Sequence, residues 1–265
     1  MQGRLLPKYK GRYQAHPVGY WADEFPLASE LGLDCIEFIV DFEEINKNPL
    51  FNSEGILELN KIKKQTRMDV LSICGDFLME APLHSKDHGL AKEGENILID
   101  LIRIASKENI ETIVIPCVDQ SSIISEKEQN IFIEKLMPIA KIAEGCNVRL
   151  SLETDLDPKS FKKVLNKLNN QNIYVNYDIG NSASLGYNYI EELNTYGSRL
   201  FDIHIKDRAL GGGSVLLGSG NADIKQFFIE LKNYHYKGPI IMQAFRDDEG
   251  FSIFKRQLEW VKDFL

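Results

Sequence analysis

Cysteine is sparse in this sequence, and its spacing carries no pairing motif. Four cysteines occur among 265 residues, and no two of them form a Cys-x-x-Cys pair. Three lie in or just after apolar, strand-like runs, where a free cysteine behaves as a small hydrophobic side chain. A disulfide framework and a structural zinc site are therefore not expected, and this usage is typical of a reducing cytoplasm. The four are Cys35, Cys74, Cys117 and Cys146.

Long hydrophobic runs and an excess of positive charge are also missing. No 18 apolar residues follow one another, and the stretch from Met1 to Pro7 lacks the apolar centre of a signal peptide. We therefore expect a soluble, cytoplasmic protein without a membrane partner. The net charge is −8 and the pI is about 5.3. Composition therefore gives no support for nucleic-acid binding.

A Gly-x-Gly-x-x-Gly turn is absent after the first strand-like segment. Such a turn is typical of open, doubly wound sheets that bind dinucleotides. The sequence has instead a regular alternation of β-rich apolar segments with segments of helical spacing. Eight strands are predicted, at residues 1–6, 35–40, 69–74, 112–117, 149–153, 173–178, 200–206 and 239–243.

A helix is predicted after each of these strands. One is expected to begin at Pro158 with Asp157 as its cap, because proline is favoured at the first helical position. Eight strand–helix units in about 250 residues predict a parallel sheet closed into a (β/α)8 TIM barrel. No repeat or linker divides the chain, so residues 1–265 are predicted to form a single domain. The other helices are expected near residues 21–31, 55–66, 89–108, 126–144, 189–196, 223–234 and from 254 onward.

Four successive predicted strands end in an inward-facing polar side chain. Catalytic groups of such barrels lie at the carboxyl ends of the strands. The two-residue alternation of a strand points Glu153, Asp178, His204 and Gln243 inward, opposite apolar neighbours. Carboxylate, imidazole and amide oxygens together suit a divalent cation with open positions. The sequence therefore predicts a site for Mn, Mg, Co or Zn.

The segments around these residues resemble the xylose isomerase-like sugar isomerase/epimerase superfamily. The loop 213–220, followed by Asp223, is similar to the loop that follows the seventh strand in that superfamily. The resemblance covers most of the chain and is strongest over residues 149–245. It implies a metal-dependent (β/α)8 barrel that acts on ketoses, ketose phosphates or inososes, without naming the substrate. The segments are LSLETD with Glu153, VNYDIGN with Asp178, DIHIKD with His204 and IIMQAF with Gln243.

Two positions depart from the pattern of this superfamily. Asn181 stands where many relatives have a histidine, and it can bind a substrate oxygen but cannot titrate. Gln243 stands where the pattern has a glutamate, and a glutamine cannot be the second base of a two-base epimerase. Three readings stay open: Glu153 is the sole base, another carboxylate such as Glu37 or Asp76 replaces the missing one, or the site binds sugar without turnover.

The predicted function is that of a divalent-metal-dependent isomerase or epimerase of a ketose or sugar phosphate. It would abstract a proton alpha to a carbonyl and stabilise the enediolate with the metal. Glu153 and Lys206 are the predicted catalytic residues, although an ion pair of Lys206 with Asp202 or Asp178 is an alternative. The predicted substrate-binding residues are Arg4, Glu37, Asp76, Asn181 and Arg246, with the two arginines assigned to a phosphate or carboxylate unless they form salt bridges.

Other classes of function remain as alternatives. A non-catalytic sugar-binding barrel would explain Gln243, and an inosose-type dehydratase would use similar chemistry. A nuclease like those of the superfamily's DNA-repair branch is disfavoured, because that branch uses several zinc ions and many histidines, whereas His204 is the only histidine at a predicted strand end. The aromatic surface of the last helix, with Phe254, Trp260 and Phe264, permits a homodimer.

Overall fold

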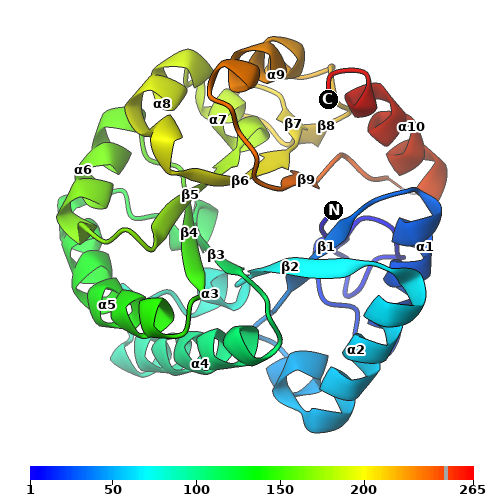
Figure 1. Ribbon diagram of the computed structural model, residues 1–265. Coiled ribbons are helices and arrows are strands. Elements are labelled where there is room, and N and C mark those ends of the chain that lie inside the picture. The colour runs from blue at the N-terminus through cyan, green and yellow to red at the C-terminus, as the bar shows by residue number, and fades with distance from the viewer. Residues whose placement is uncertain (248–249) are drawn as a thin grey trace.

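Seven parallel strands form the central sheet of the computed structural model, which describes residues 1–247 and 250–265. Neighbouring strands in the sheet are also neighbours in the sequence, apart from a short hairpin inserted after β6. In Figure 1 the strands surround a central axis and the helices form the outer ring. The strands are β1 Cys35–Ile39, β2 Asp69–Cys74, β3 Thr112–Cys117, β4 Arg149–Thr154, β5 Ile173–Asp178, β6 Leu200–Ile205 and β9 Ile240–Met242.

Eight helices of the outer ring match the predicted positions. The Asp157 side chain accepts hydrogen bonds from the amides of Lys159 and Ser160, at 3.0 and 3.1 Å, and so caps the helix that begins at Pro158. These helices are α1 Glu24–Glu30, α2 Ser53–Thr66, α4 His88–Lys107, α5 Glu126–Gly145, α6 Pro158–Leu168, α8 Tyr189–Tyr196, α9 Ile224–Asn233 and α10 Phe251–Lys262.

Besides several 3-10 turns, four short elements that the sequence pattern did not predict lie in the loops. Two are helices of fewer than eight residues, and two are the strands of the hairpin after β6. All of them follow the carboxyl end of a strand of the sheet. They are α3 Phe77–Glu80, α7 Ile179–Leu185, β7 Asp207–Arg208 and β8 Ser214–Val215.

The predicted first strand, at residues 1–6, is wrong as a strand. The segment lies between β9 and β1, as Figure 1 shows, but makes only isolated backbone bonds to them. The Gln2 amide donates to the Met242 carbonyl at 3.2 Å, and the Glu37 amide donates to the Met1 carbonyl at 2.8 Å. Gly3 then takes a φ of +49°, which ends the extended conformation. The barrel predicted from the alternation is confirmed, with this segment closing the gap between its two outer strands.

The alternation of side chains along β6 places apolar residues against the helices and polar residues inside the barrel. Ile203 and Ile205 of β6 are fully buried and belong to the apolar core, which fills the space between the sheet and the helices. Asp202 and His204 are also fully buried, but they point into the barrel, where their contacts are polar. The polar interior of the barrel is therefore a consequence of the sequence pattern of its strands.

Within the described part of the chain, no helix has the length and the apolar character needed to cross a membrane.

Candidate active site

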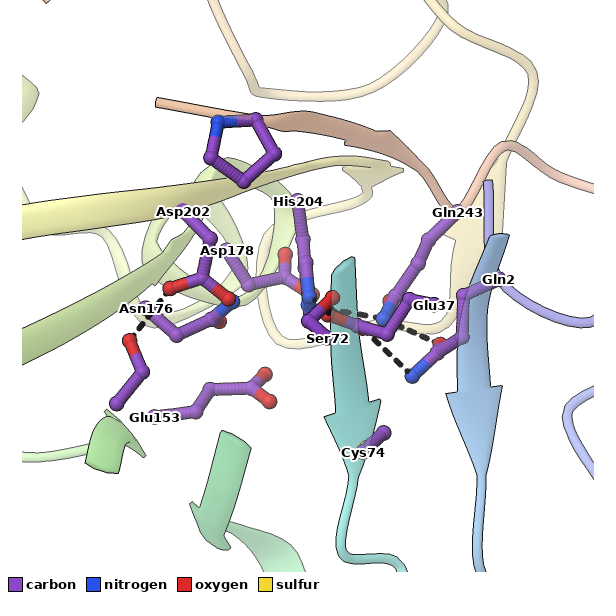
Figure 2. Close-up of polar contacts among 12 residues, drawn as sticks. Gln2, Glu37, Ser72, Cys74, Glu153, Asn176, Asp178, Asp202, His204 and Gln243 are labelled. Atoms are coloured by element: carbon purple, nitrogen blue, oxygen red, sulfur yellow. Dashed lines mark hydrogen bonds and ion pairs between the residues drawn. The ribbon is translucent and has the colours of Figure 1, made fainter. Parts of the chain in front are cut away.

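Three neighbouring strands bring a buried group of potential metal ligands together. Glu153 lies near the end of β4, Asp178 at the end of β5 and His204 near the end of β6. One ligand atom of each side chain lies within 4.8 Å of the others. Their exposed fractions are 7%, 4% and 0%. The structure therefore assembles three of the four predicted metal-binding side chains in one group (Figure 2).

This donor set fits a divalent cation. Two carboxylates and one imidazole are hard and borderline ligands, and they leave coordination positions for substrate oxygens. His204 Nε2 is buried and lacks a hydrogen-bond partner, although it lies 2.9 Å from Glu37 Oε1. The ring nitrogen therefore lies among carboxylates, and His204 also forms a second group of potential ligands with Glu37 and Asp202. A cation could be held by Glu153, Asp178 and His204.

Glu153 lies in surroundings that favour its protonated form. Burial raises the pKa of Glu153 to about 7; the charge of His204 opposes this shift and that of Asp178 adds to it. Asn181 donates from Nδ2 to Glu153 Oε1 at 2.7 Å, which orients the carboxylate. A carboxyl group that titrates near neutral pH and is held in one orientation is suited to proton transfer.

Asp178 is fixed by the helix that follows it. Its Oδ1 accepts a hydrogen bond from the Asn181 amide at 2.8 Å, so Asp178 caps α7. Its Oδ2 lies 3.4 Å from Lys206 Nζ. Of the two ion-pair partners considered for Lys206, the structure selects Asp178. Arg208 donates to Asn181 Oδ1 at 2.9 Å and completes the support of this side of the site.

A chain of amides connects Gln243 to Glu37 behind the histidine. Gln243 Nε2 lies 2.8 Å from His204 Nδ1 and donates to Gln2 Oε1 at 2.5 Å. Gln2 Nε2 donates in turn to Glu37 Oε1 at 3.1 Å, and Ser72 Oγ donates to Glu37 Oε2 at 2.7 Å. Figure 2 shows His204 between these residues and the carboxylates of Glu153 and Asp178. Partners of this kind fix the ring orientation of a metal-binding histidine.

Gln2 and Ser72 were missed by the sequence analysis. Ser72 lies on β2, two residues before Cys74, on the inward side that the alternation of that strand defines. Gln2 carries no sequence signal, because its segment is not a regular strand and its partner Gln243 is 241 residues away.

The opposite charges of Glu37 and His204 each favour the ionised form of the other side chain. Burial by itself raises the pKa of Glu37, but His204 and the hydrogen bond from Ser72 outweigh burial, so the pKa lies below its ordinary value. Burial lowers the pKa of His204, but the surrounding carboxylates, Glu37 first, raise it to about 9. Glu37 is 1% exposed and lies inside the barrel. It lies 2.9 Å from His204 Nε2, and with His204 and Asp202 it forms a second group of potential metal ligands.

A second polar layer lies beneath the first, two residues earlier on the same three strands. Asp202 is fully buried and accepts hydrogen bonds from Ser151 Oγ and, at 2.7 Å, from Asn176 Nδ2. Burial raises the pKa of Asp202 to about 6, with Glu37 as a further cause. The hydrogen bonds of this layer join β4, β5 and β6 two residues before Glu153, Asp178 and His204.

The remaining predicted substrate-binding residues lie on the other side of the barrel mouth. Asp76 follows β2, and its pKa is raised to about 6 by burial and by Asp41. Arg4 donates from three nitrogens to the carbonyls of Gly3 and Ala244 and to Gln14 Oε1. Arg246 donates to the Arg4 carbonyl. The structure therefore brings Arg4 and Arg246 together, but not into the group formed by Glu153, Asp178 and His204.

A cavity of about 1100 Å³ lies at the opposite end of the barrel. Residues at the amino ends of several strands line it, among them Cys35, Leu200 and Ile240. In this fold the amino ends contribute to stability and the carboxyl ends to chemistry. The site is therefore assigned to the end that holds Glu153, Asp178 and His204, in spite of the size of this cavity.

The fold and the buried carboxylate–histidine group define a class of barrel protein with a candidate metal centre. The chain belongs to the family described as xylose isomerase-like TIM barrel, which matches residues 25–264. The matched range includes all seven strands of the sheet and each of Glu153, Asp178, His204 and Gln243.

Two curated relatives are similar over most of their length. L-ribulose-5-phosphate 3-epimerase UlaE of Salmonella heidelberg (strain SL476) is 26% identical over 260 residues, which cover 94% of this chain and 92% of the relative. A putative L-ribulose-5-phosphate 3-epimerase, SgbU, of Haemophilus influenzae (strain ATCC 51907 / DSM 11121 / KW20 / Rd) is 24% identical over 242 residues, covering 86% and 84%.

Solved structures share the fold at lower sequence identity. The 3-keto-D-glucoside 4-epimerase YcjR from E. coli superposes with a TM-score of 0.75 at 16% identity and covers 91% of this chain and 94% of its own. D-psicose 3-epimerase from Clostridium cellulolyticum H10, solved with D-tagatose, gives 0.70 at 17% identity and covers 92% of each chain. A xylose isomerase-like TIM barrel protein from Mycobacterium smegmatis, in complex with magnesium, gives 0.72 at 16% identity and covers 99% and 93%.

Proposed function

We propose that this protein is a divalent-metal-dependent isomerase or epimerase of a ketose or sugar phosphate. One observation carries the proposal: one ligand atom each of the buried Glu153, Asp178 and His204 side chains lies within 4.8 Å of the others, inside the carboxyl end of the barrel. The names of the curated relatives, both ribulose-phosphate epimerases, support the same class of reaction.

The proposed roles follow from the contacts of each side chain. Glu153 removes a proton from the carbon next to the carbonyl and returns it, while Asn181 holds the carboxylate in position. Lys206, 14% exposed and 3.4 Å from Asp178, adds positive charge on the side where negative charge develops on the substrate. When bound, the cation would polarise the sugar oxygens. The amide nitrogen of Gln243 contacts His204 and Gln2 and so orients the His204 ring, and its carbonyl oxygen remains the predicted fourth metal ligand.

Epimerisation requires a second proton carrier on the opposite face of the substrate. Inside the barrel, Glu37 accepts hydrogen bonds from Gln2 and Ser72 and lies 2.9 Å from His204 Nε2. Asp76 lies at the mouth, and its pKa of about 6, raised by burial, allows it to exchange a proton. If the enzyme is an epimerase, Asp76 is the better candidate for this role; with Glu153 alone, the reaction is an aldose–ketose isomerisation.

Solvent exchange tests this proposal directly. The metal-loaded protein is incubated in D2O with a panel of ketoses and ketose phosphates, and deuterium incorporation is followed by NMR. Exchange at C1 or C2 indicates an isomerase, and exchange at C3 or C4 an epimerase. Glu153→Gln should reduce the rate by about 10²- to 10⁴-fold, because the proton acceptor is lost. The matched control is Glu134→Gln on the exposed face of α5, which should leave the rate unchanged.

Metal content gives a test that does not depend on turnover. His204→Ala should lose bound divalent metal, whereas His88→Ala, an exposed histidine, should retain it. Equal metal content in both variants would contradict the proposed centre. Metal and sugar binding without any exchange would favour a non-catalytic sugar-binding barrel, the class that the glutamine at position 243 first suggested.

A further inference from the structure

The mouth of the barrel carries a concentration of positive charge that the proposed reaction does not use. The chain as a whole has a net charge of −8, yet its first 22 residues contain four cationic side chains and no acidic one. A segment of this charge on an acidic protein indicates an anionic contact. The four are Arg4, Lys8, Lys10 and Arg12.

This segment crosses the carboxyl ends of the strands that face the candidate metal centre. Arg12 Nη2 lies 3.0 Å from Asp41, just past β1, and Arg12 Nη1 lies 4.0 Å from Asp76, just past β2. Arg246, which follows β9, donates to the Arg4 carbonyl. Burial lowers the pKa of Arg4 to about 10, and the nearby charges of Asp76 and Asp178 oppose that shift. The segment and the metal centre therefore share one end of the barrel.

Most of these cations already have partners within the protein. Lys10 Nζ lies 2.6 and 2.7 Å from Glu43 and Glu44. Arg4 donates to three acceptors and is only 8% exposed. Arg12 is paired with Asp41, although its side chain is 48% exposed. Their charges are needed for the structure of the segment.

Arg246 is different. Among residues 1–247 and 250–265, no carboxylate lies within 4.0 Å of its guanidinium. Its Nε is buried without a hydrogen-bond partner. The guanidinium stacks on the ring of Tyr13, 4.8 Å from the centroid, and this contact fixes its plane. A planar, oriented guanidinium with unused donors is suited to bidentate binding of a phosphate.

We propose that Arg246, supported by the Tyr13 ring, binds the phosphate group of a sugar-phosphate substrate whose carbonyl end lies at Glu153, Asp178 and His204. This inference rests on the proposed function and gives it a substrate class. Among proteins that share the fold or family, some are named for free ketoses and others for a ketose 5-phosphate. Arg246, which has no carboxylate within 4.0 Å among residues 1–247 and 250–265, favours the phosphorylated class.

The first test uses binding alone. Inorganic phosphate is titrated into the wild type, Arg246→Gln and Arg246→Lys, with calorimetry as readout and circular dichroism as the check of folding. Wild type should bind, and Arg246→Gln should bind about 10- to 100-fold more weakly, since a charged hydrogen-bond donor to the phosphate is lost. Arg246→Lys keeps the charge but loses the planar fork, so its affinity should lie between the two. Arg103→Gln, an exposed arginine on α4, is the matched control and should bind like wild type.

The second test uses substrate preference. Deuterium exchange is compared for ketoses and the 5-phosphates of the same sugars, and the ratio of their kcat/KM values should fall about 10- to 100-fold in Arg246→Gln. Equal use of free and phosphorylated sugars by wild type, with no phosphate binding, would overturn the subsite and leave the proposed function standing. Phosphate binding that depends on Arg246, without exchange for any sugar, would refute the proposed function and retain the anion site. Phosphate binding of equal strength in wild type and Arg246→Gln would also overturn the subsite.

Discussion

His204 contacts polar side chains through both of its ring nitrogens, and the two contacts have different consequences. Nδ1 lies 2.8 Å from the amide nitrogen of Gln243, whereas Nε2 lies 2.9 Å from Glu37 without a hydrogen bond. The orientation of the Gln243 amide is fixed by Gln2, which is fixed in turn by Glu37. A residue at the start of the chain therefore influences a ring near the end of β6.

Replacing Gln2 tests this series of contacts from Glu37 through Gln2 and Gln243 to His204. In Gln2→Ala, both Glu37 and Gln243 lose a buried partner, so unfolding should become easier by roughly 1–3 kcal/mol. Urea unfolding measures the change, and metal titration should show weaker binding, because the His204 ring is less firmly held. Gln65→Ala, on the exposed surface of α2, should change the free energy of unfolding by at most about 0.5 kcal/mol. Equal stability of the two variants would show that the amide chain contributes nothing measurable.

At the scale of elements, regular strands were predictable and irregular segments were not. The alternation in β4, β5 and β6 identified Glu153, Asp178 and His204 as inward strand-end residues, and the structure places them together. Residues 1–6 have the composition of a strand, but Gly3 at φ +49° interrupts it. The contacts of Gln2 could not follow from the sequence, because they depend on closure of the barrel over a separation of 241 residues.

Three backbone amides of the loop after β6 donate to one buried carboxylate, that of Asp207. Asp207 is 0% exposed. It accepts hydrogen bonds from the amides of Gly218, Gly220 and Ala222, at 2.9, 2.8 and 3.0 Å. A Cβ atom on Gly220 would lie 2.2 Å from Asp207 Oδ1, so only glycine allows this approach. Gly218 and Gly220 thus serve the attachment of this loop to the barrel.

Asp207→Asn should therefore loosen the loop. Asparagine replaces one acceptor oxygen with a donor group, so at least one backbone amide loses its partner, at a cost of roughly 1–3 kcal/mol. Hydrogen–deuterium exchange of residues 208–223 should become faster, while exchange in α4 and α5 stays the same. Asp100→Asn, in an exposed ion pair on α4, is the matched control. Uniformly faster exchange over the whole chain would instead indicate general destabilisation.

At the scale of the whole molecule, one histidine is expected to influence acid stability. His16 lies in the aromatic group formed with Trp21 and Phe38, at ring-centroid distances of 6.3 and 5.2 Å. Its backbone amide donates to Asp41, but its buried Nε2 has no hydrogen-bond partner in the part of the chain that the structure describes. Burial lowers the pKa of His16 from 6.5 to about 4. The folded protein therefore keeps this ring neutral at a pH where the unfolded chain binds a proton.

The sign of the effect follows from proton uptake on unfolding. Well above pH 6.5, the reference pKa of histidine, His16 is neutral in both states and contributes no pH dependence. As the pH falls from 6.5 toward 4, the unfolded state gains a proton that the folded state excludes, so stability decreases, by up to roughly 3 kcal/mol. His16→Phe retains the aromatic packing and removes this loss. The difference in unfolding free energy between wild type and His16→Phe, measured by urea titration, should therefore shift in favour of the variant as the pH is lowered from 7 to 4. His88→Phe, which replaces an exposed histidine, should follow the wild-type curve, and a constant difference for His16→Phe at every pH would contradict the assigned role.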